Sequence, residues 1–525
     1  MFQGLFLLAA VLLFVPAFRR QVRTWIRTLP LPLWDSGRRA WLTKALILLA
    51  ALAVFVALRT ANHLLGDGYL YLRDLDAGIL QSTQRAPLTF ALIGLLHGAS
   101  GVLWETAENT YRLYSYASGV LFVLLSFPVA GTIGTTPREK SIVLALLLSG
   151  GYLQLFFGYV ETYALCMPGI LLYLLLGLRV LESRMSILFP ALFLSLLVNL
   201  HLALVLLFPS LLVLAHRSQR NRRTAAALLS FFPASAALFL WLTDVDLATH
   251  LSRLGGSHLL PLLSEPGFRE PYRLFSLAHV LDFLNVQALA APGAWMAMAM
   301  LDKRAVGHHI FLLTAAAFPL LFTFLANPEI GAFRDWDFLA LPALPLTLWA
   351  ASALLARVRD PNSAFHIVVL ICGAAALHSL MWIGLNSSPT ASEARYAHLM
   401  DGLTGHAASY GWETLGSHYY LHDKPLQELN AYKRALEANP ENARHWGAVG
   451  ITYNTMDKHE ESIPYLRKAL QINPDLPNIY LHLGMACANT GRMEEAREIL
   501  QTFLKLSPKD PLAPRIREVL EDIDN

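Results

Sequence analysis

Residues 185–215 read MSILFPALFLSLLVNLHLALVLLFPSLLVLA and contain no Asp, Glu, Lys or Arg. A helix crosses the hydrocarbon core of a bilayer with roughly 20 apolar residues, so this stretch is too long for one span. If this stretch were counted as a single span, the basic run at 216–223 would lie on the opposite side of the membrane from the other basic connections. We therefore expect a tight hairpin of two short helices, with Asn199 and His201 at its outer tip.

The composition of the whole chain agrees with a membrane protein. Of its 525 residues, 55% are hydrophobic and 15% are charged, whereas roughly 25% of the residues in a soluble domain are charged. The net charge of +3 is small for this length and gives no basic field for nucleic acid. Three scattered cysteines are too few for a disulfide framework or a thiolate metal site. We expect an all-α, polytopic membrane bundle without a nucleic-acid partner.

Further apolar runs predict the other membrane spans. The N-terminal run precedes its arginines, the reverse of a cleaved signal, and is therefore interpreted as a retained first span. The run at 87–104 carries His97 and two glycines, and we place it as an interfacial helix on the outer face. The predicted spans, with the hairpin included, are 2–18, 41–59, 111–133, 141–157, 162–180, 185–215, 224–242, 279–301, 308–326, 338–356 and 365–385.

Arginine and lysine collect in alternate short connections, which the positive-inside rule assigns to the cytoplasm. With the hairpin counted as two crossings, all basic connections fall on one side, and about twelve crossings leave both chain ends outside. The basic connections are at 19–44, 138–140, 179–184, 217–223, 303–304 and 357–359.

The C-terminal part of the chain repeats every 34 residues. Subtraction gives this period for three sets of residues, which are Trp412, Trp446 and Tyr480; Gly416, Gly450 and Gly484; and Pro440, Pro474 and Pro508. This is the period and residue pattern of tetratricopeptide (TPR) repeats, in which each unit is a helix pair and the proline ends the second helix. The sequence therefore predicts three TPR repeats, followed by a capping helix at 515–523.

These features divide the chain into four parts. We predict an extra span with a basic loop at 1–40, a transmembrane domain at 41–385, a linker at 386–406 and the TPR solenoid at 407–525. The solenoid offers a surface for a peptide or protein partner, and the alternative is a folding or dimerisation spacer.

Three clusters of ionisable residues lie at the predicted outer ends of spans, where charges are costly and commonly functional. The clusters are Asp67 with Arg73 and Asp74; Glu161 in a short turn; and Arg334 with Asp335 and Asp337. Structural alternatives remain for each. Asp67 and Glu161 could end turns or cap helices, the Arg334 group could be self-paired, and His201 could be a packed polar residue. No spacing indicates a metal site or a nucleotide loop, so no cofactor is expected.

The order of these elements over 41–385 resembles the GT-C superfamily of membrane glycosyltransferases. An acid, Asp67, begins the first outer loop, and a Pro-Leu-rich amphipathic helix at 86–96 and the helix start Tyr111-Arg112-Leu113 follow. One hairpin then carries Glu161 and Tyr163 at its tip and the next carries His201. Together with outward-facing TPR repeats, the pattern resembles the TMTC-type O-mannosyltransferases of animals.

The resemblance implies transfer of a sugar from a polyprenyl-phosphate donor at the extracytoplasmic face of the membrane. Asp67 would be the general base and Glu161 would orient a substrate. Arg334 or Arg73 would stabilise the leaving phosphate. The remaining substrate-binding candidates are Asp74, His201, Asp335 and Asp337. The family commonly has paired acids in the first loop, whereas Gly68 follows Asp67 here.

That departure favours a second hypothesis, a non-catalytic membrane scaffold whose TPR repeats recruit partners. The number of predicted spans argues against this hypothesis, because a single span is enough to tether a TPR array to the membrane. A third hypothesis is an O-antigen ligase or polymerase, for which the outer loop at 243–278 is small. The Ala, Leu and Arg content suggests a bacterial inner membrane, with the TPR repeats on the periplasmic side and membrane lipids around the bundle.

The arginine alternation predicts a topology that reporter fusions can test. A reporter active only outside the cytoplasm should be active when fused after Asn525 and silent when inserted near Gln219. The opposite pair of results would refute the proposed orientation.

Overall fold

The computed structural model describes residues 32–78, 85–99, 106–217, 222–243, 258–299, 309–357 and 364–524. The described part is all-helical, as predicted, and has one isolated β-bridge between Leu259 and Ala326. The chain forms two compact units. The first comprises Met1–Leu263, Tyr272–Asn327 and Ala332–Glu393, and the second comprises Ser264–Pro271, Pro328–Gly331 and Ala394–Asn525. The predicted span at 2–18 lies outside the described residues, and the predicted domain limits stay predictions.

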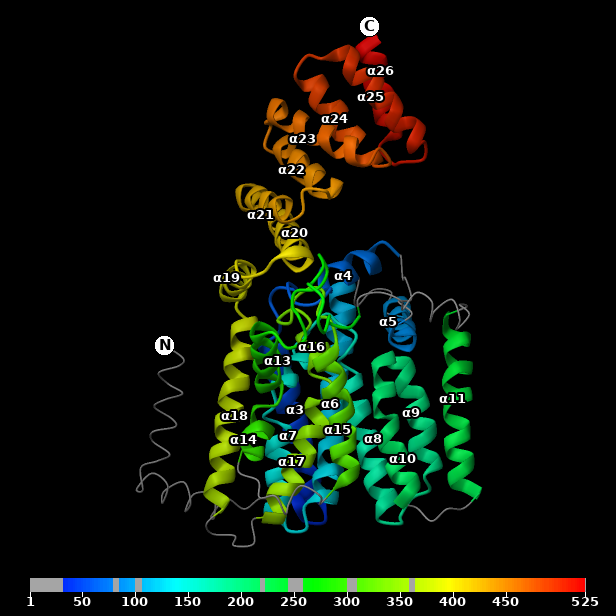
Figure 1. Ribbon diagram of the computed structural model, residues 1–525, viewed down its shortest axis with the longest axis vertical. Coiled ribbons are helices and arrows are strands. Elements are labelled where there is room, and N and C mark those ends of the chain that lie inside the picture. Colours follow the sequence, from blue (N-terminus) through cyan, green and yellow to red (C-terminus); the bar gives the residue numbers. More distant parts are fainter. Residues whose placement is uncertain are drawn as a thin grey trace. The chain divides into compact units, whose positions relative to one another are not determined.

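The helices of the first unit include a group in which α8, α9 and α10 pack side by side (Figure 1). In chain order the elements are η1 (Pro32–Trp34), α3 (Arg38–Ala57), α4 (Gly68–Asp76), α5 (Pro87–Ala99), α6 (Ala107–Ile133), α7 (Pro137–Leu147), η2 (Gly151–Phe156), α8 (Cys166–Leu181), α9 (Leu188–Leu200), η3 (Leu202–Leu207), α10 (Phe208–Arg217), α11 (Arg222–Thr243), α13 (Leu277–Ala290), α14 (Pro292–Met298), α15 (Ile310–Leu325), α16 (Trp336–Leu339), α17 (Ala343–Arg357) and α18 (Ala364–Asn386). Helix α19 (Pro389–Met400) follows and continues into the second unit.

Four helices in the described part are long and apolar enough to cross a membrane. They are Arg38–Ala57, Ala107–Ile133, Trp336–Ala356 and Val368–Asn386, and they coincide with the predicted spans at 41–59, 111–133, 338–356 and 365–385. The other apolar helical stretches in the described part, among them Leu228–Thr243 within α11, are shorter than 18 residues. The number of crossings, about twelve, therefore stays a prediction.

Local chemistry explains where apolar runs are interrupted. The run at 185–215 is divided at His201, whose backbone is extended between α9 and η3, as the sequence predicts. Two runs expected as single spans are also divided. The run at 141–157 consists of α7 and η2, with Gly150 between them, and Gly151 packs against the backbone of α13 so closely that a Cβ would lie 1.9 Å from the Leu289 carbonyl oxygen. The run at 279–301 breaks at Ala291, because Pro292 begins a new helix.

The second unit contains the repeats that the 34-residue period predicts. Its helix pairs are α20 (Gly405–Leu421) with α21 (Pro425–Ala438), α22 (Ala443–Thr455) with α23 (His459–Ile472), and α24 (Pro477–Asn489) with α25 (Met493–Leu506) (Figure 1). Helix α26 (Ala513–Asp524) covers the predicted capping helix.

The period is visible in the packing of each pair. A Cβ on Gly416, Gly450 or Gly484 would lie 2.5 to 2.6 Å from the side chain of Tyr432, Leu466 or Leu500 respectively, so these glycines let the paired helices approach. Between the two helices, a residue with positive φ recurs at Asp423, Asp457 and Gly491. The N–H of the following residue donates to a carbonyl near the end of the first helix at 2.9 to 3.0 Å, which ends that helix in the left-handed manner common to helix C-termini.

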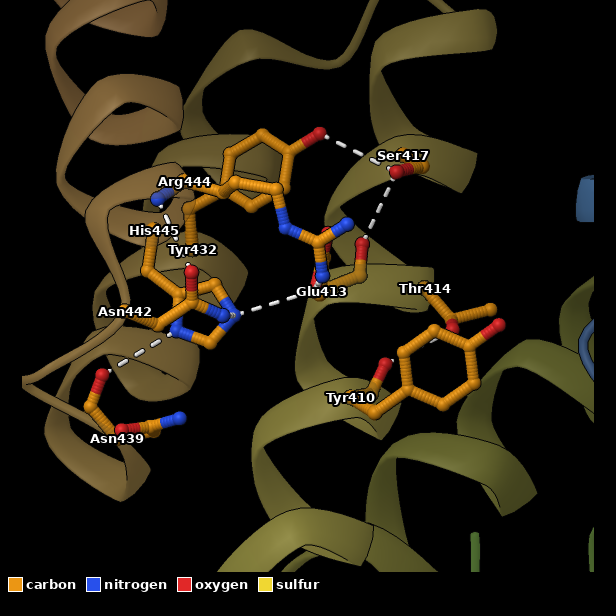
Figure 2. Close-up of polar contacts among 9 residues, drawn as sticks. All are labelled: Tyr410, Glu413, Thr414, Ser417, Tyr432, Asn439, Asn442, Arg444 and His445. Carbon is orange, nitrogen blue, oxygen red and sulfur yellow. Dashed lines mark hydrogen bonds and ion pairs between the residues drawn. The ribbon is translucent and has the colours of Figure 1, made fainter. Parts of the chain in front are cut away.

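The first two repeats are joined by a polar cluster around Glu413 of α20 (Figure 2). Its Oε2 lies 3.1 Å from Nε2 of the buried His445 and 3.4 Å from the Arg444 guanidinium, both on α22. Burial alone would raise the pKa of Glu413, but the hydrogen bond with His445 and the positive charge of Arg444 outweigh it, so this pKa lies below its usual value.

A carboxyl group with a depressed folded-state pKa contributes stability above its unfolded-state pKa, and this contribution is lost as the pH falls through the folded-state pKa. We predict that a fragment of residues 405–525 folds cooperatively and loses stability as the pH falls below about 4.5. Glu413→Gln should reduce the slope in that acid range, measured by urea unfolding across a pH series. The exposed Glu437→Gln serves as a control and should leave the slope nearly unchanged, whereas an unchanged slope in Glu413→Gln would refute the assignment.

Candidate functional site

A buried polar network fixes the loop that follows α3. The Thr60 N–H and Oγ1 donate to the Phe157 carbonyl at 2.7 and 3.0 Å, and Gln154 Nε2 donates to Thr60 Oγ1 at 3.0 Å. Asn386, at the end of α18, donates to Gln154 Oε1 at 3.3 Å and accepts the Ala61 N–H at its carbonyl oxygen. The loop after α3 and the loop after η2 are therefore held together.

Arg334 clamps the end of this loop. Its guanidinium Nη2 donates to the Gly66 carbonyl at 2.9 Å, and the Gly66 N–H donates to the Arg334 carbonyl at 3.1 Å. The Arg334 side chain is fully buried. Arg334 thus connects the loop before α16 to the residue immediately before Asp67.

The clamp brings two predicted carboxyl groups together. The Asp67 N–H donates to Glu161 Oε1 at 2.8 Å, and the Thr162 N–H donates to Glu161 Oε2 at 3.1 Å. Glu161 is buried, while Asp67 is half-buried. Asp67 occupies the N-cap position of α4, but its side chain makes no capping hydrogen bond there, so the capping interpretation of this residue is not supported by its contacts.

Gly66 makes this approach of backbone to carboxyl possible. Its φ is +60°, a left-handed conformation that L side chains seldom adopt. A Cβ at this position would lie 2.3 Å from Glu161 Oε1. Glycine is therefore required at position 66 to avoid a collision with Glu161, and not only to form a turn.

Asp337 is buried and lies within electrostatic range of Glu161. Its Oδ2 accepts the Tyr159 hydroxyl at 3.2 Å, and Tyr159 in turn accepts the Trp336 indole N–H at 3.1 Å. Burial, and then the negative charges of Asp337 and Asp67, raise the pKa of Glu161 well above its usual value. The buried Glu161 is thereby biased toward its neutral form, and Asp67 is the half-buried carboxyl group of this set.

Two half-buried tyrosines border Asp67 and Glu161. Tyr71 lies within electrostatic range of both carboxyl groups, and its ring lies 5.5 Å from that of Phe90 and 6.3 Å from that of Tyr111. Tyr163 lies within electrostatic range of Glu161 and packs against His201, with ring centroids 4.6 Å apart and ring planes tilted by 38°. Flat apolar faces beside carboxyl oxygens give a surface on which a sugar ring could stack and hydrogen-bond.

The remaining predicted site residues lie around this group. Arg73 and Asp74 pair with each other on α4 at 2.8 Å, and the Arg73 side chain is largely exposed. Asp335 is the N-cap residue of α16 and lies within electrostatic range of Tyr163. The structure therefore brings together Asp67, Glu161, Arg334 and Asp337, with His201 beside Tyr163.

Sequence reasoning missed Tyr71 and Tyr159. In an aromatic-rich membrane sequence neither stands out, although Tyr71 follows Asp67 by four residues, the spacing of one helical turn. Among the described residues, no group of three or more His, Cys, Asp or Glu side chains is arranged to hold a metal ion.

Comparisons with known proteins address the two units differently. Family models for the tetratricopeptide repeat match residues 429–477 and 455–517, which confirms the repeats that the period predicts. The Arabidopsis OM64 TPR domain is 22% identical, with a TM-score of 0.22, and the match covers 22% of this chain and 95% of that domain. No curated protein matches the chain.

Two crystal structures of ArnT from Cupriavidus metallidurans are also similar to this chain. The structure bound to undecaprenyl phosphate is 13% identical, has a TM-score of 0.43, and the match covers 89% of this chain and 80% of ArnT. The apo structure is 14% identical, with a TM-score of 0.42 and coverages of 88% and 80%. The C-terminal part of the chain thus consists of tetratricopeptide repeats.

Proposed function

We propose that this protein is a membrane glycosyltransferase that moves a sugar from a polyprenyl-phosphate donor to an acceptor hydroxyl at the extracytoplasmic face, in a bacterial inner membrane. The observation that carries the proposal is the pairing of the accessible Asp67 with the buried Glu161 through the Asp67 N–H. The Arg334 clamp and the half-buried tyrosines support it, because they fix Asp67 beside aromatic surface.

In this proposal Asp67 accepts the proton of the acceptor hydroxyl as the acceptor oxygen bonds to the anomeric carbon of the donor sugar. The bond from that carbon to the phosphate oxygen breaks, and the polyprenyl phosphate leaves with the bonding electron pair. Glu161 is a positioning residue, because it holds the Asp67 backbone N–H and is itself buried. Nothing in this scheme requires a nucleotide, since the donor is already activated as a phosphodiester in the membrane.

The proposed partner of the TPR array is the acceptor protein or another protein of the same assembly. The competing function is a scaffold that uses only this array. The arrangement around the buried Glu161 argues against a scaffold, since its hydrogen bond from the Asp67 N–H fixes the position of a half-buried carboxyl group, which a membrane anchor does not need. A scaffold would also tolerate loss of the Asp67 carboxylate, which makes the two functions separable by mutation.

Asp67→Asn removes the proton acceptor while keeping the size of the side chain. We predict normal insertion and a loss of transfer of at least roughly 10²-fold, as general-base contributions usually run from 10² to 10⁴. Glu161→Gln should cost less, because an amide oxygen can still accept the Asp67 N–H. The measurement is a complementation phenotype in the native host, followed by transfer with a purified donor. Retained transfer in Asp67→Asn would favour the scaffold.

A pair of glycine variants separates steric effects from backbone strain. Gly66 and Gly78 both have left-handed φ, +60° and +66°, but only at Gly66 would a Cβ strike Glu161, because nothing lies within 4 Å of a Cβ at Gly78. Gly66→Ala should therefore abolish transfer, and Gly78→Ala should retain it with equal amounts of protein in the membrane. Equal losses in both variants would show that strain, and not the Gly66 to Glu161 contact, is responsible.

A further inference from the structure

Two arginines lie at the ends of α3 and α6 that the predicted topology places at the outer face. Arg59 follows the end of α3 by two residues, and Arg112 lies in the second turn of α6. Short connections outside the cytoplasm usually carry few arginines. The two arginines are therefore unexpected on that side, and their surroundings indicate what they bind.

The side chains of Arg59, Arg112 and Tyr116 converge at Gly158. A Cβ on this glycine would lie 3.1 Å from the Tyr116 hydroxyl oxygen, 3.2 Å from the Arg112 Cγ and 3.6 Å from the Arg59 Cβ. Arg112 and Tyr116 are four residues apart on α6, so they lie on the same face of that helix. Arg59, Arg112 and Tyr116 thus form one group, which we call the outer arginine cluster.

The outer arginine cluster carries an excess of positive charge. Glu108 Oε1 lies 2.6 Å from Arg112 Nη2 and 2.8 Å from His63 Nε2, and Glu108 is also within electrostatic range of Arg59. The exposed Arg59 forms no ion pair within the described part of the chain, and the Tyr116 hydroxyl forms no hydrogen bond there. Two arginines beside one glutamate therefore leave a positive charge and a hydroxyl donor for a ligand, even with His63 counted as neutral.

The cluster lies at the end of an apolar surface formed by α3 and α6. The two helices pack closely, because a Cβ on Gly119 would lie 2.6 Å from the Phe55 ring. Arg59 follows Phe55 by four residues and Tyr116 precedes Gly119 by three, so both lie about one turn beyond this contact. Both helices are long and apolar enough to cross a membrane. Their exposed apolar side chains include Val54, Val56, Leu121 and Leu124.

We propose that the outer arginine cluster binds the phosphodiester of an anionic phospholipid, such as phosphatidylglycerol, whose acyl chains lie along α3 and α6. The Arg59 guanidinium and the Tyr116 hydroxyl donate hydrogen bonds to the phosphate, and Arg112, which Glu108 holds in place, adds positive charge. A zwitterionic lipid binds less tightly, because its ammonium group meets the same excess of positive charge. This inference goes beyond the proposed function, since it requires no sugar transfer.

The buried His63 separates this cluster from the residue that follows Asp67. A Cβ on Gly68 would lie 3.0 Å from the His63 Cβ, while the other end of the His63 side chain contacts Glu108. A phospholipid of the surrounding membrane can therefore occupy the cluster while the donor of the proposed function reaches Asp67.

The test is photo-crosslinking of the full-length protein in detergent micelles. The probe is phosphatidylglycerol with a diazirine near its glycerol backbone, and mass spectrometry identifies the labelled peptides. Label is expected at the end of α3 and the start of α6. Unlabelled phosphatidylglycerol should compete for this label at a concentration at least about tenfold lower than phosphatidylcholine, since a hydrogen bond with a charged group changes affinity by roughly 10- to 100-fold. Equal competition by the two lipids, or no label at these positions, would overturn the proposal.

Variants assign the preference to individual side chains. Arg59→Gln should lose most of the preference for phosphatidylglycerol at this position, and Arg59→Lys should keep much of it because the charge remains. Tyr116→Phe should weaken binding by only roughly two- to tenfold, the usual range for one neutral hydrogen bond. Arg184→Gln is the matched control, because it removes an exposed arginine that also pairs with a glutamate, Glu182. This control should be labelled at α3 and α6 like the wild type.

The outcomes separate this inference from the proposed function. If Arg59→Gln keeps the preference, or if Arg184→Gln loses it equally, the outer arginine cluster is refuted as the site. Unlabelled undecaprenyl phosphate should compete no more strongly than phosphatidylglycerol, and stronger competition would assign the cluster to the donor instead of a phospholipid. Asp67→Asn should be labelled like the wild type whether or not transfer is observed.

Discussion

The hydrogen bond from the Asp67 N–H to Glu161 Oε1 is the contact on which the arrangement of the site depends. It joins the loop after α3 to the loop after η2, and it forms only because Gly66 has no Cβ to occupy the position of the carboxyl oxygen. Arg334 brings a third segment to the same point by exchanging two hydrogen bonds with Gly66. A change in any of these three segments therefore acts on Asp67.

The same contact explains why a buried acid is tolerated here. Both oxygens of Glu161 accept a backbone N–H, which offsets much of the cost of removing the carboxyl group from water. The nearby Asp337 is likewise hydrogen-bonded, to Tyr159 and to the Phe338 N–H. Hydrogen bonding thus fixes two acids in the interior and leaves Asp67, the third, half-exposed.

Sequence reasoning singled out Asp67, Glu161, Arg334 and Asp337, because charged residues beside apolar runs are rare, and the structure places these four residues close together. It did not predict the contacts of each side chain, such as the hydrogen bond from Arg334 Nη2 to the Gly66 carbonyl, and the expected role of Arg334 at a phosphate stays a prediction. The repeats were predictable from the sequence, since each glycine meets the side chain at the equivalent position of the second helix, which is Tyr432, Leu466 or Leu500. The broken spans were less predictable, because hydropathy does not register the close backbone contact at Gly151.

The missing second acid after Asp67 has a physical explanation in this fold. A Cβ on Gly68 would lie 3.0 Å from the His63 Cβ and 3.3 Å from the Val160 carbonyl oxygen, so a side chain there would need His63 and the residue before Glu161 to shift slightly. Glu161 itself supplies a second carboxyl group next to Asp67, from a different segment of the chain. The absence of an acid at position 68 does not by itself favour a scaffold over an enzyme.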